Sequence, residues 1–271
     1  MQKSLSFKNS TISFSDVGKG PAVVLLHGFL ENSTMWKDVV PELTETKRVV
    51  TIDLLGHGQT DCLGYVHSME IMAEAVYAVL KSLRLRKVIV VGHSMGGYVA
   101  LALAEQHPKM IKGLCLMNST SYADDEERKQ LRARANKMVQ NNFENMVRMS
   151  FTNLFEEVSR TLFKQEIELA LAEALKTPVQ GYIASQEGMR IRPDRSHVLE
   201  KSTFPSFYII ASEDPVIDAI SNNKEAIKVG AKIYGIEGGH MSHIENKELL
   251  VGGLCGCISY INNFSSSKKE N

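Results

Sequence analysis

The sequence predicts an α/β domain built on a mostly parallel sheet. Near-continuous apolar runs alternate along the chain with segments whose apolar residues recur at helical spacing. The apolar runs are residues 22–26, 49–52, 88–91, 114–117, 207–210 and 233–236. Such runs are typical of strands that helices cover on both faces, and their alternation with helices favours parallel strands joined by right-handed crossovers. We therefore expect functional loops at the carboxyl ends of these strands.

The N-terminal segments differ from these runs. Residues 5–7 and 11–14 alternate between apolar and polar, as half-buried antiparallel strands do, and the GKGP sequence of 18–21 predicts a turn. Helical spacing follows in two places, residues 36–43 and 72–83, each with one apolar stripe. A further helix is predicted over 98–103.

The alternation breaks between Ser121 and His197. A charged start at 124–128 leads into helical segments rich in Met and Phe, which predicts a helical cap at 121–197 inserted into a core of residues 1–120 and 198–264. The cap is expected to roof the entrance to a substrate cavity. Met and Phe at helical spacing also serve in plain packing, so each is open to both interpretations. The candidate cavity residues are Met138, Phe143, Met146, Met149, Phe151 and Phe155, of which Met146 and Phe151 are taken as candidate substrate-binding residues.

The end of the chain combines a glycine-rich helix with a polar tail. Gly252, Gly253 and Gly256 each cost a helix about 1 kcal/mol relative to alanine, which close packing against the sheet would offset. Residues 265–271 have nothing to bury, and we expect them to be disordered.

Composition narrows the classes of partner. The 271 residues are 44% hydrophobic, and 31 basic side chains balance 31 acidic ones. This balance gives no field that favours nucleic acid or an anionic membrane, so small neutral or modestly charged substrates fit best. The chain shows no signal-peptide h-region and no run of about 18 apolar residues, so we expect a soluble, cytoplasmic protein without membrane insertion.

No cofactor or metal is expected. The cysteines Cys62, Cys115, Cys255 and Cys257 lack zinc-ligand spacing and are interpreted as free thiols, with the last two on different sides of a helix. No P-loop and no G-x-G-x-x-G sequence follows a strand, and the histidines form no metal cluster.

Residues 92–97 (GHSMGG) carry the strongest chemical signal. They lie between the apolar run 88–91 and the predicted helix, where a serine flanked by glycines is typical of a nucleophile elbow. Ser94 would sit in a strained turn, and small neighbours such as Gly92 and Gly96 let the helix lie against the strand.

A serine hydroxyl needs a base, and that base needs an orienting acid. Asp214 follows the run 207–210 and His240 follows 233–236, in the Ser, Asp, His order of this architecture. Asp218 competes with Asp214 as the acid, or caps the next helix. His243 competes with His240, or reaches a carboxylate such as Glu245.

Together these motifs resemble the α/β-hydrolase superfamily, in particular its capped serine esterases and lipases. The resemblance covers nearly the whole chain, and several linked motifs occur in the correct order. Beyond the elbow, the matching segments are 27–29 (HGF), 53–58 (DLLGHG), 188–194 (GMRIRPD) and 239–245 (GHMSHIE).

The resemblance implies residue roles. Ser94 is the nucleophile, His240 the general base and then acid, and Asp214 the carboxylate that fixes the imidazole tautomer. The backbone N–H groups of Phe29 and Met95 form the oxyanion hole. Further implied roles are structural: His27 holds the oxyanion loop, and Asp53, Gly56, His57 and Gly58 shape a turn. His93, from its position inside the elbow, is interpreted as a packed neighbour of Ser94.

The implied reaction is cofactor-free hydrolysis of a small carboxylic ester through an acyl-enzyme. A serine in the elbow disfavours dehalogenase and epoxide hydrolase chemistry, which needs an aspartate nucleophile. Carbon–carbon bond hydrolysis and perhydrolysis use the same triad, although relatives that cleave carbon–carbon bonds carry tryptophan where Met241 stands. A non-catalytic ligand-binding protein of this fold is the alternative from another class.

Overall fold

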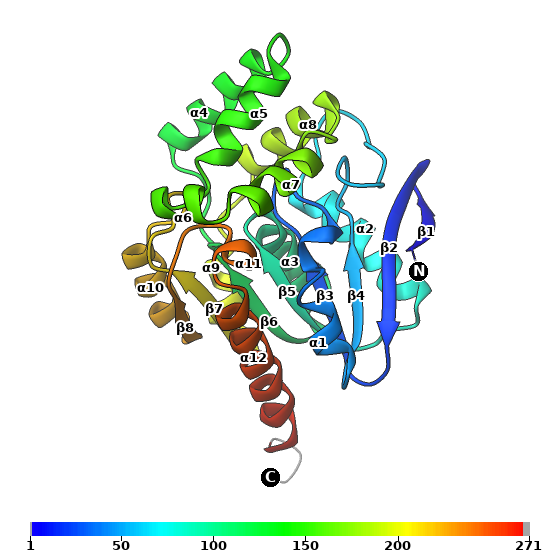
Figure 1. Ribbon diagram of the computed structural model, residues 1–271. Helices are drawn as coiled ribbons and strands as arrows, with labels where there is room; N and C mark the ends of the chain where they lie inside the picture. The colour runs from blue at the N-terminus through cyan, green and yellow to red at the C-terminus, as the bar shows by residue number, and fades with distance from the viewer. Residues whose placement is uncertain (1, 268–271) are drawn as a thin grey trace.

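One eight-stranded sheet forms the centre of the computed structural model, which describes residues 2–267 (Figure 1). The strand order is β1-β2-β4-β3-β5-β6-β7-β8; β1, β2 and β4 pair antiparallel, and the remaining pairs are parallel. The strands are β1 (Gln2–Phe7), β2 (Ser10–Gly18), β3 (Ala22–Leu26), β4 (Arg48–Ile52), β5 (Val88–His93), β6 (Ile111–Met117), β7 (Ser206–Ala211) and β8 (Lys232–Ile236). The predicted fold class, a mostly parallel α/β sheet, is confirmed.

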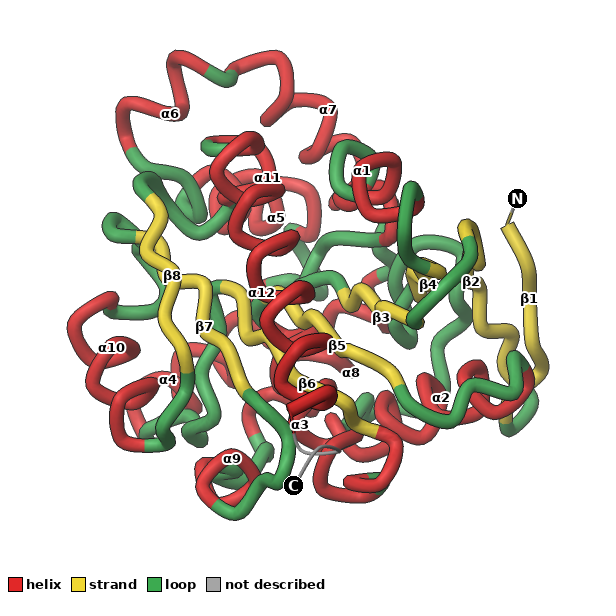
Figure 2. Tube along the Cα trace, turned by 90° about the horizontal axis from the view of Figure 1, so that it is seen from below, coloured by secondary structure: helices red, strands yellow, loops and turns green. Residues whose placement is uncertain are grey.

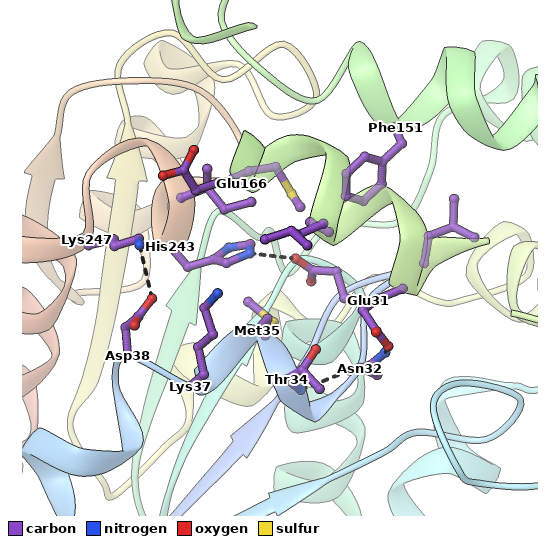
Figure 3. Close-up of a pocket in the computed structure, with 16 residues that line it drawn as sticks. Glu31, Asn32, Thr34, Met35, Lys37, Asp38, Phe151, Glu166, His243 and Lys247 are labelled. Carbon is purple, nitrogen blue, oxygen red and sulfur yellow. Dashed lines mark hydrogen bonds and ion pairs between the residues drawn. The ribbon is translucent and has the colours of Figure 1, made fainter. Parts of the chain in front are cut away.

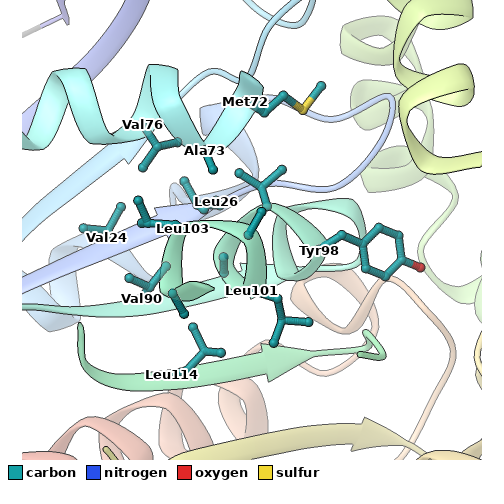
Figure 4. Packing of buried hydrophobic residues seen from close by; sticks show 14 of the residues in the cluster. Val24, Leu26, Met72, Ala73, Val76, Val90, Tyr98, Leu101, Leu103 and Leu114 are labelled. Atoms are coloured by element: carbon teal, nitrogen blue, oxygen red, sulfur yellow. The ribbon is translucent and has the colours of Figure 1, made fainter. Parts of the chain in front are cut away.

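Helices cover both faces of the sheet (Figure 2). Val24 and Val90 point to the face where α2 and α3 pack (Figure 4). Their neighbours Val23 and Val91 point to the opposite face, where α12 packs. Because both faces are dry, β3 and residues 88–91 of β5 are apolar at every position. The helices of the core are η1 (Ser33–Trp36), α1 (Val40–Thr44), α2 (Met69–Ser82), α3 (Met95–Gln106), η2 (Pro108–Met110), α9 (Ser196–Glu200), α10 (Ala219–Lys228), α11 (Ser242–Glu245) and α12 (Lys247–Ser267).

Two elements differ from the sequence-based expectation. The helical spacing of 36–43 is divided between η1 and α1, because Pro41 has no N–H for the carbonyl of Lys37 and its ring would clash there. β8 is an edge strand rather than a strand covered on both faces, and Ile233 is 37% exposed.

Between β6 and β7 a helical insertion stands beyond the carboxyl ends of the strands (Figure 1). Its helices are α4 (Glu126–Met138), α5 (Phe143–Thr152), α6 (Glu157–Leu162), α7 (Lys164–Ala174) and α8 (Val179–Arg190). α8 is fastened to the core by backbone contact: a Cβ on Gly188 would lie 1.8 Å from the His67 carbonyl oxygen, and one on Gly181 would lie 2.3 Å from that of Gly56. Only glycine allows so close an approach.

The C-terminal helix α12 runs away from this insertion (Figure 1). It continues through residues 265–267, three residues into the segment expected to be disordered, and residues 268–271 of that segment lie outside the described residues. Gly253 packs on the Tyr234 ring, as the close-packing expectation requires, but nothing lies within 4 Å of a Cβ built on Gly252 or Gly256. No helix in the described part of the chain has the length and apolarity to span a membrane.

Candidate active site

Ser94 occupies the turn between β5 and α3 in a strained conformation, with φ 48° and ψ −116°. The backbone elements meet closely around it. A Cβ on Gly92 would lie 2.4 Å from the Gly96 carbonyl oxygen, and one on Gly96 would lie 2.4 Å from that of Leu26. These contacts are the physical reason for glycine on both sides of the serine.

His240 and Asp214 form a buried pair beyond β8 and β7. Nδ1 of His240 lies 2.7 Å from Oδ2 of Asp214, and both side chains are at most 3% exposed. Oδ1 of Asp214 accepts the N–H groups of Val216 and Ile217, and Oδ2 also accepts Nδ2 of Asn118. Burial alone would raise the pKa of Asp214, but the adjacent His240 and these N–H donors lower it, so the carboxylate stays charged.

The two competing residues take other partners. Asp218 caps α10, where its Oδ2 accepts the N–H of Ser221 at 2.8 Å. His243 does not reach Glu245, whose carboxylate accepts backbone N–H groups of Gly239 and Met241. Instead, Nε2 of His243 lies 3.7 Å from Oε1 of Glu31.

The backbone N–H groups of Phe29 and Met95, which are expected to bind an oxyanion, come from different elements, and both are available to donate a hydrogen bond. Within the described residues, the N–H of Phe29 has no hydrogen-bond acceptor. Met95 is the first residue of α3, where N–H groups have no partner inside the helix. His27 supports the preceding loop, because its Nε2 accepts the N–H of Leu54 while its Nδ1 bonds the carbonyl oxygen of Gly28.

Sequence reasoning missed a buried ion pair behind this loop. Oε2 of Glu31 accepts the N–H of Gly28 at 2.6 Å and lies 2.7 Å from Nδ1 of His93. Nε2 of His93 lies 3.0 Å from the carbonyl oxygen of His240. Burial alone would lower the pKa of His93, but the charge of Glu31 raises it. His93 is therefore more than a packed neighbour of Ser94, since it connects the Gly28 and His240 loops.

A cavity of about 260 Å³ opens over Ser94 and His240. Its floor comes from the strand ends, and its roof comes from the helical insertion. The insertion residues that line it are Arg128, Leu131, Arg132, Ala135, Met146, Ser150, Leu154, Tyr182, Gln186 and Met189.

Of the two candidate substrate-binding residues, only Met146 lines this cavity. Phe151 is placed elsewhere: it is buried beside a second cavity of about 250 Å³, together with His243, Glu166 and Lys247 (Figure 3). The reason is helical geometry, since five residues turn an α-helix by about 140° and so present Met146 and Phe151 to different sides of α5. Met138 and Met149 are exposed, at 55% and 57%.

Comparison with known proteins identifies the family. A family model described as the alpha/beta hydrolase fold matches residues 21–247, and the chain therefore belongs to this family. The solved structure of a thermophilic esterase from Thermogutta terrifontis, with malate bound, superposes with a TM-score of 0.90 at 26% identity, covering 96% of this chain and 99% of that one.

The chain is also similar to curated proteins. A 3-oxoadipate enol-lactonase from Acinetobacter baylyi is 24% identical over 255 residues, 94% of each chain. Uncharacterized proteins of Mycobacterium are 37% identical over 113 residues, 42% of this chain and only 33% of theirs.

Proposed function

We propose that this protein hydrolyses small carboxylic esters by a serine mechanism. The observation that carries the proposal is geometric: Ser94 and His240 line one cavity, and His240 is held by the buried carboxylate of Asp214. The similarity to an esterase and an enol-lactonase supports the same bond type, because both names denote hydrolysis of an ester linkage.

The mechanism follows from these positions. His240 takes the proton of Ser94 as its hydroxyl attacks the ester carbonyl, and the amides of Phe29 and Met95 bind the oxyanion that forms. Asp214 accepts from Nδ1 of His240 and stabilises the imidazolium. His240 then protonates the departing alcohol, and a water molecule that it activates hydrolyses the acyl-enzyme.

The helical insertion acts as the cap in this proposal. We keep for it the bounds predicted from the sequence, residues 121–197, and propose that it supplies the acyl-chain specificity through residues such as Met146. Replacing Met146 with alanine enlarges the cavity and is expected to shift the preferred p-nitrophenyl ester to a longer acyl chain. Met149, exposed on the same helix, gives the control substitution, and an unchanged chain-length profile for Met146→Ala would count against this role.

The decisive experiment measures p-nitrophenol release from acetate and butyrate esters. Ser94→Ala is expected to abolish release above background, a loss of about 10⁴-fold or more in kcat. Ser150 is a second serine of the same cavity, so Ser150→Ala tests whether the loss is specific to Ser94. Release that survives in Ser94→Ala would refute the serine mechanism, and no release by the natural sequence would favour a ligand-binding role.

A second substitution tests the acid. Asp214→Asn is expected to lower kcat by about 10⁴-fold, because an amide no longer fixes the tautomer of His240. Asp218→Asn changes the same charge four residues away, at a helix cap, and is expected to retain activity. Equal effects of the two substitutions on kcat would contradict the assignment.

A further inference from the structure

One cation in the candidate active site has no acidic partner. Arg128 of α4 lines the cavity over Ser94, and its Nη2 donates to the carbonyl oxygen of Val216 at 2.8 Å. No carboxylate of the described residues lies within ion-pair distance of its guanidinium group. Val216 belongs to the loop of Asp214, so this contact holds the cation close to the triad.

The charged side chains that line the cavity over Ser94 provide no ion pair for Arg128. Arg132, the second arginine that lines the cavity, is paired with Asp124 at 2.5 Å, and Asp124 also lies 2.7 Å from Arg192. Among the described residues, the acid that lines the cavity is Glu31, which is paired with His93. Of the two arginines that line the cavity, Arg128 is therefore the one without an ion pair, and the low-dielectric wall strengthens the field of its charge.

The contact with Val216 also fixes where the charge lies. Because the guanidinium carries five N–H donors and one is used on Val216, donors remain for a planar anion, which guanidinium binds in a bidentate manner. A solvent-exposed arginine with no partner would not indicate a bound anion, because water hydrates its charge. Here the cation faces a cavity that also holds the proposed nucleophile.

We propose that the substrate of this site carries a carboxylate, which Arg128 binds while Ser94 attacks the ester carbonyl. This inference rests on the proposed ester hydrolysis and specifies its substrate class. It also refines the expectation from the neutral net charge of the chain, since the cavity holds an arginine without an ion pair although the total charge is zero.

The test compares matched esters with and without a carboxylate. Monomethyl glutarate and its neutral amide analogue place the group on the acyl side, and O-acetylglycolate and O-acetylglycolamide place it on the alcohol side. In one of the two pairs, the acid is expected to be hydrolysed with the higher kcat/KM. Arg128→Gln is expected to reduce that acid-to-amide ratio by about 10- to 100-fold, the value of a charge-assisted hydrogen bond.

Two further variants make the result specific to the charge in the cavity. Arg128→Lys keeps the charge but loses the bidentate geometry, so it is expected to recover part of the ratio. Arg134 is an exposed arginine of the same helix that does not line the cavity, and Arg134→Gln is expected to leave the ratio unchanged. The same dependence for Arg134→Gln would show a long-range charge effect and overturn the inference.

The outcomes separate the two proposals. If the amides are hydrolysed in a Ser94-dependent manner with no preference for either acid, or if Arg128→Gln leaves the ratio unchanged, ester hydrolysis stands and the carboxylate inference fails. If no ester of either pair or of the p-nitrophenyl series is hydrolysed, the proposed function itself fails, and the inference fails with it.

Discussion

Glu31 and His93 form a buried pair that connects the loop of Gly28 to the loop of His240. The two acceptors around His93, the Glu31 carboxylate and the His240 carbonyl, require a proton on both ring nitrogens, so the imidazole carries a positive charge. Both side chains are almost fully buried. A buried charge without its partner is costly, which makes this pair sensitive to a change in either member.

Removal of one partner is therefore expected to destabilise the fold. Glu31→Gln should lower the free energy of unfolding by about 3–5 kcal/mol, because it leaves His93 without its counter-charge. Glu144→Gln breaks an exposed ion pair with Arg148 and should cost at most about 1 kcal/mol. Urea unfolding curves of the two variants measure the difference, and equal midpoints would contradict the importance of the buried pair.

Some residues of the candidate site could be predicted from the sequence, and others could not. Ser94, Asp214 and His240 each follow an apolar run, so the position of each at a strand end could be predicted. Glu31 carries no such signal, because its partner His93 is 62 residues away and only the folded sheet brings the two loops together. Phe151 was misplaced for a related reason, since apolar residues on one helix give no indication of which of two cavities each one faces.

At the scale of elements, the apolar runs were sufficient to predict where the strands lie, but the run 233–236 did not reveal that β8 is an exposed edge strand. The boundaries of the elements depended on individual contacts. α2 begins at Met69, because the Ser68 side chain accepts the N–H of Ile71 and so caps the helix. This start lies three residues before Met72, the first apolar residue of the predicted stripe. In the segment 36–43 the apolar periodicity predicts one helix, but the effect of Pro41 on the backbone outweighs it and divides the segment.

The glycines of α12 provide a prediction at this scale. Gly252→Ala and Gly256→Ala face open space and should each raise the free energy of unfolding by about 0.5–1 kcal/mol, the helix-propensity difference. Gly253→Ala, with its Cβ 2.6 Å from the Tyr234 ring, should instead lower it. Thermal unfolding of the three variants checks the signs, and stabilisation by Gly253→Ala would show that Tyr234 moves freely.

For the whole molecule, buried histidines set the response to acid. Burial lowers the pKa of His27, His57, His67 and His243, to about 3 for His57 and about 4 for the last two. The unfolded chain protonates these groups near pH 6.5 while the folded chain does not. Unfolding therefore takes up protons below that pH, and the stability of the fold falls as pH decreases.

The expected slope is about 1.4 kcal/mol per pH unit for each such histidine once the unfolded form is protonated. His93 has a raised pKa and acts in the opposite sense: its contribution is present below pH 6.5 and is lost at higher pH. The free energy of unfolding, measured in urea at pH 7, 6 and 5, should therefore decrease steeply, and His67→Gln should reduce the slope. A stability that does not change over this range would contradict the burial of neutral imidazoles.

The glycine contacts of α8 determine what kind of movement is open to the molecule. A helix whose backbone touches the core at Gly181 and Gly188 has no layer of side chains on which to slide. A movement of the insertion that keeps these contacts must therefore leave α8 in place, so the other helices of the insertion are the ones free to shift relative to the sheet.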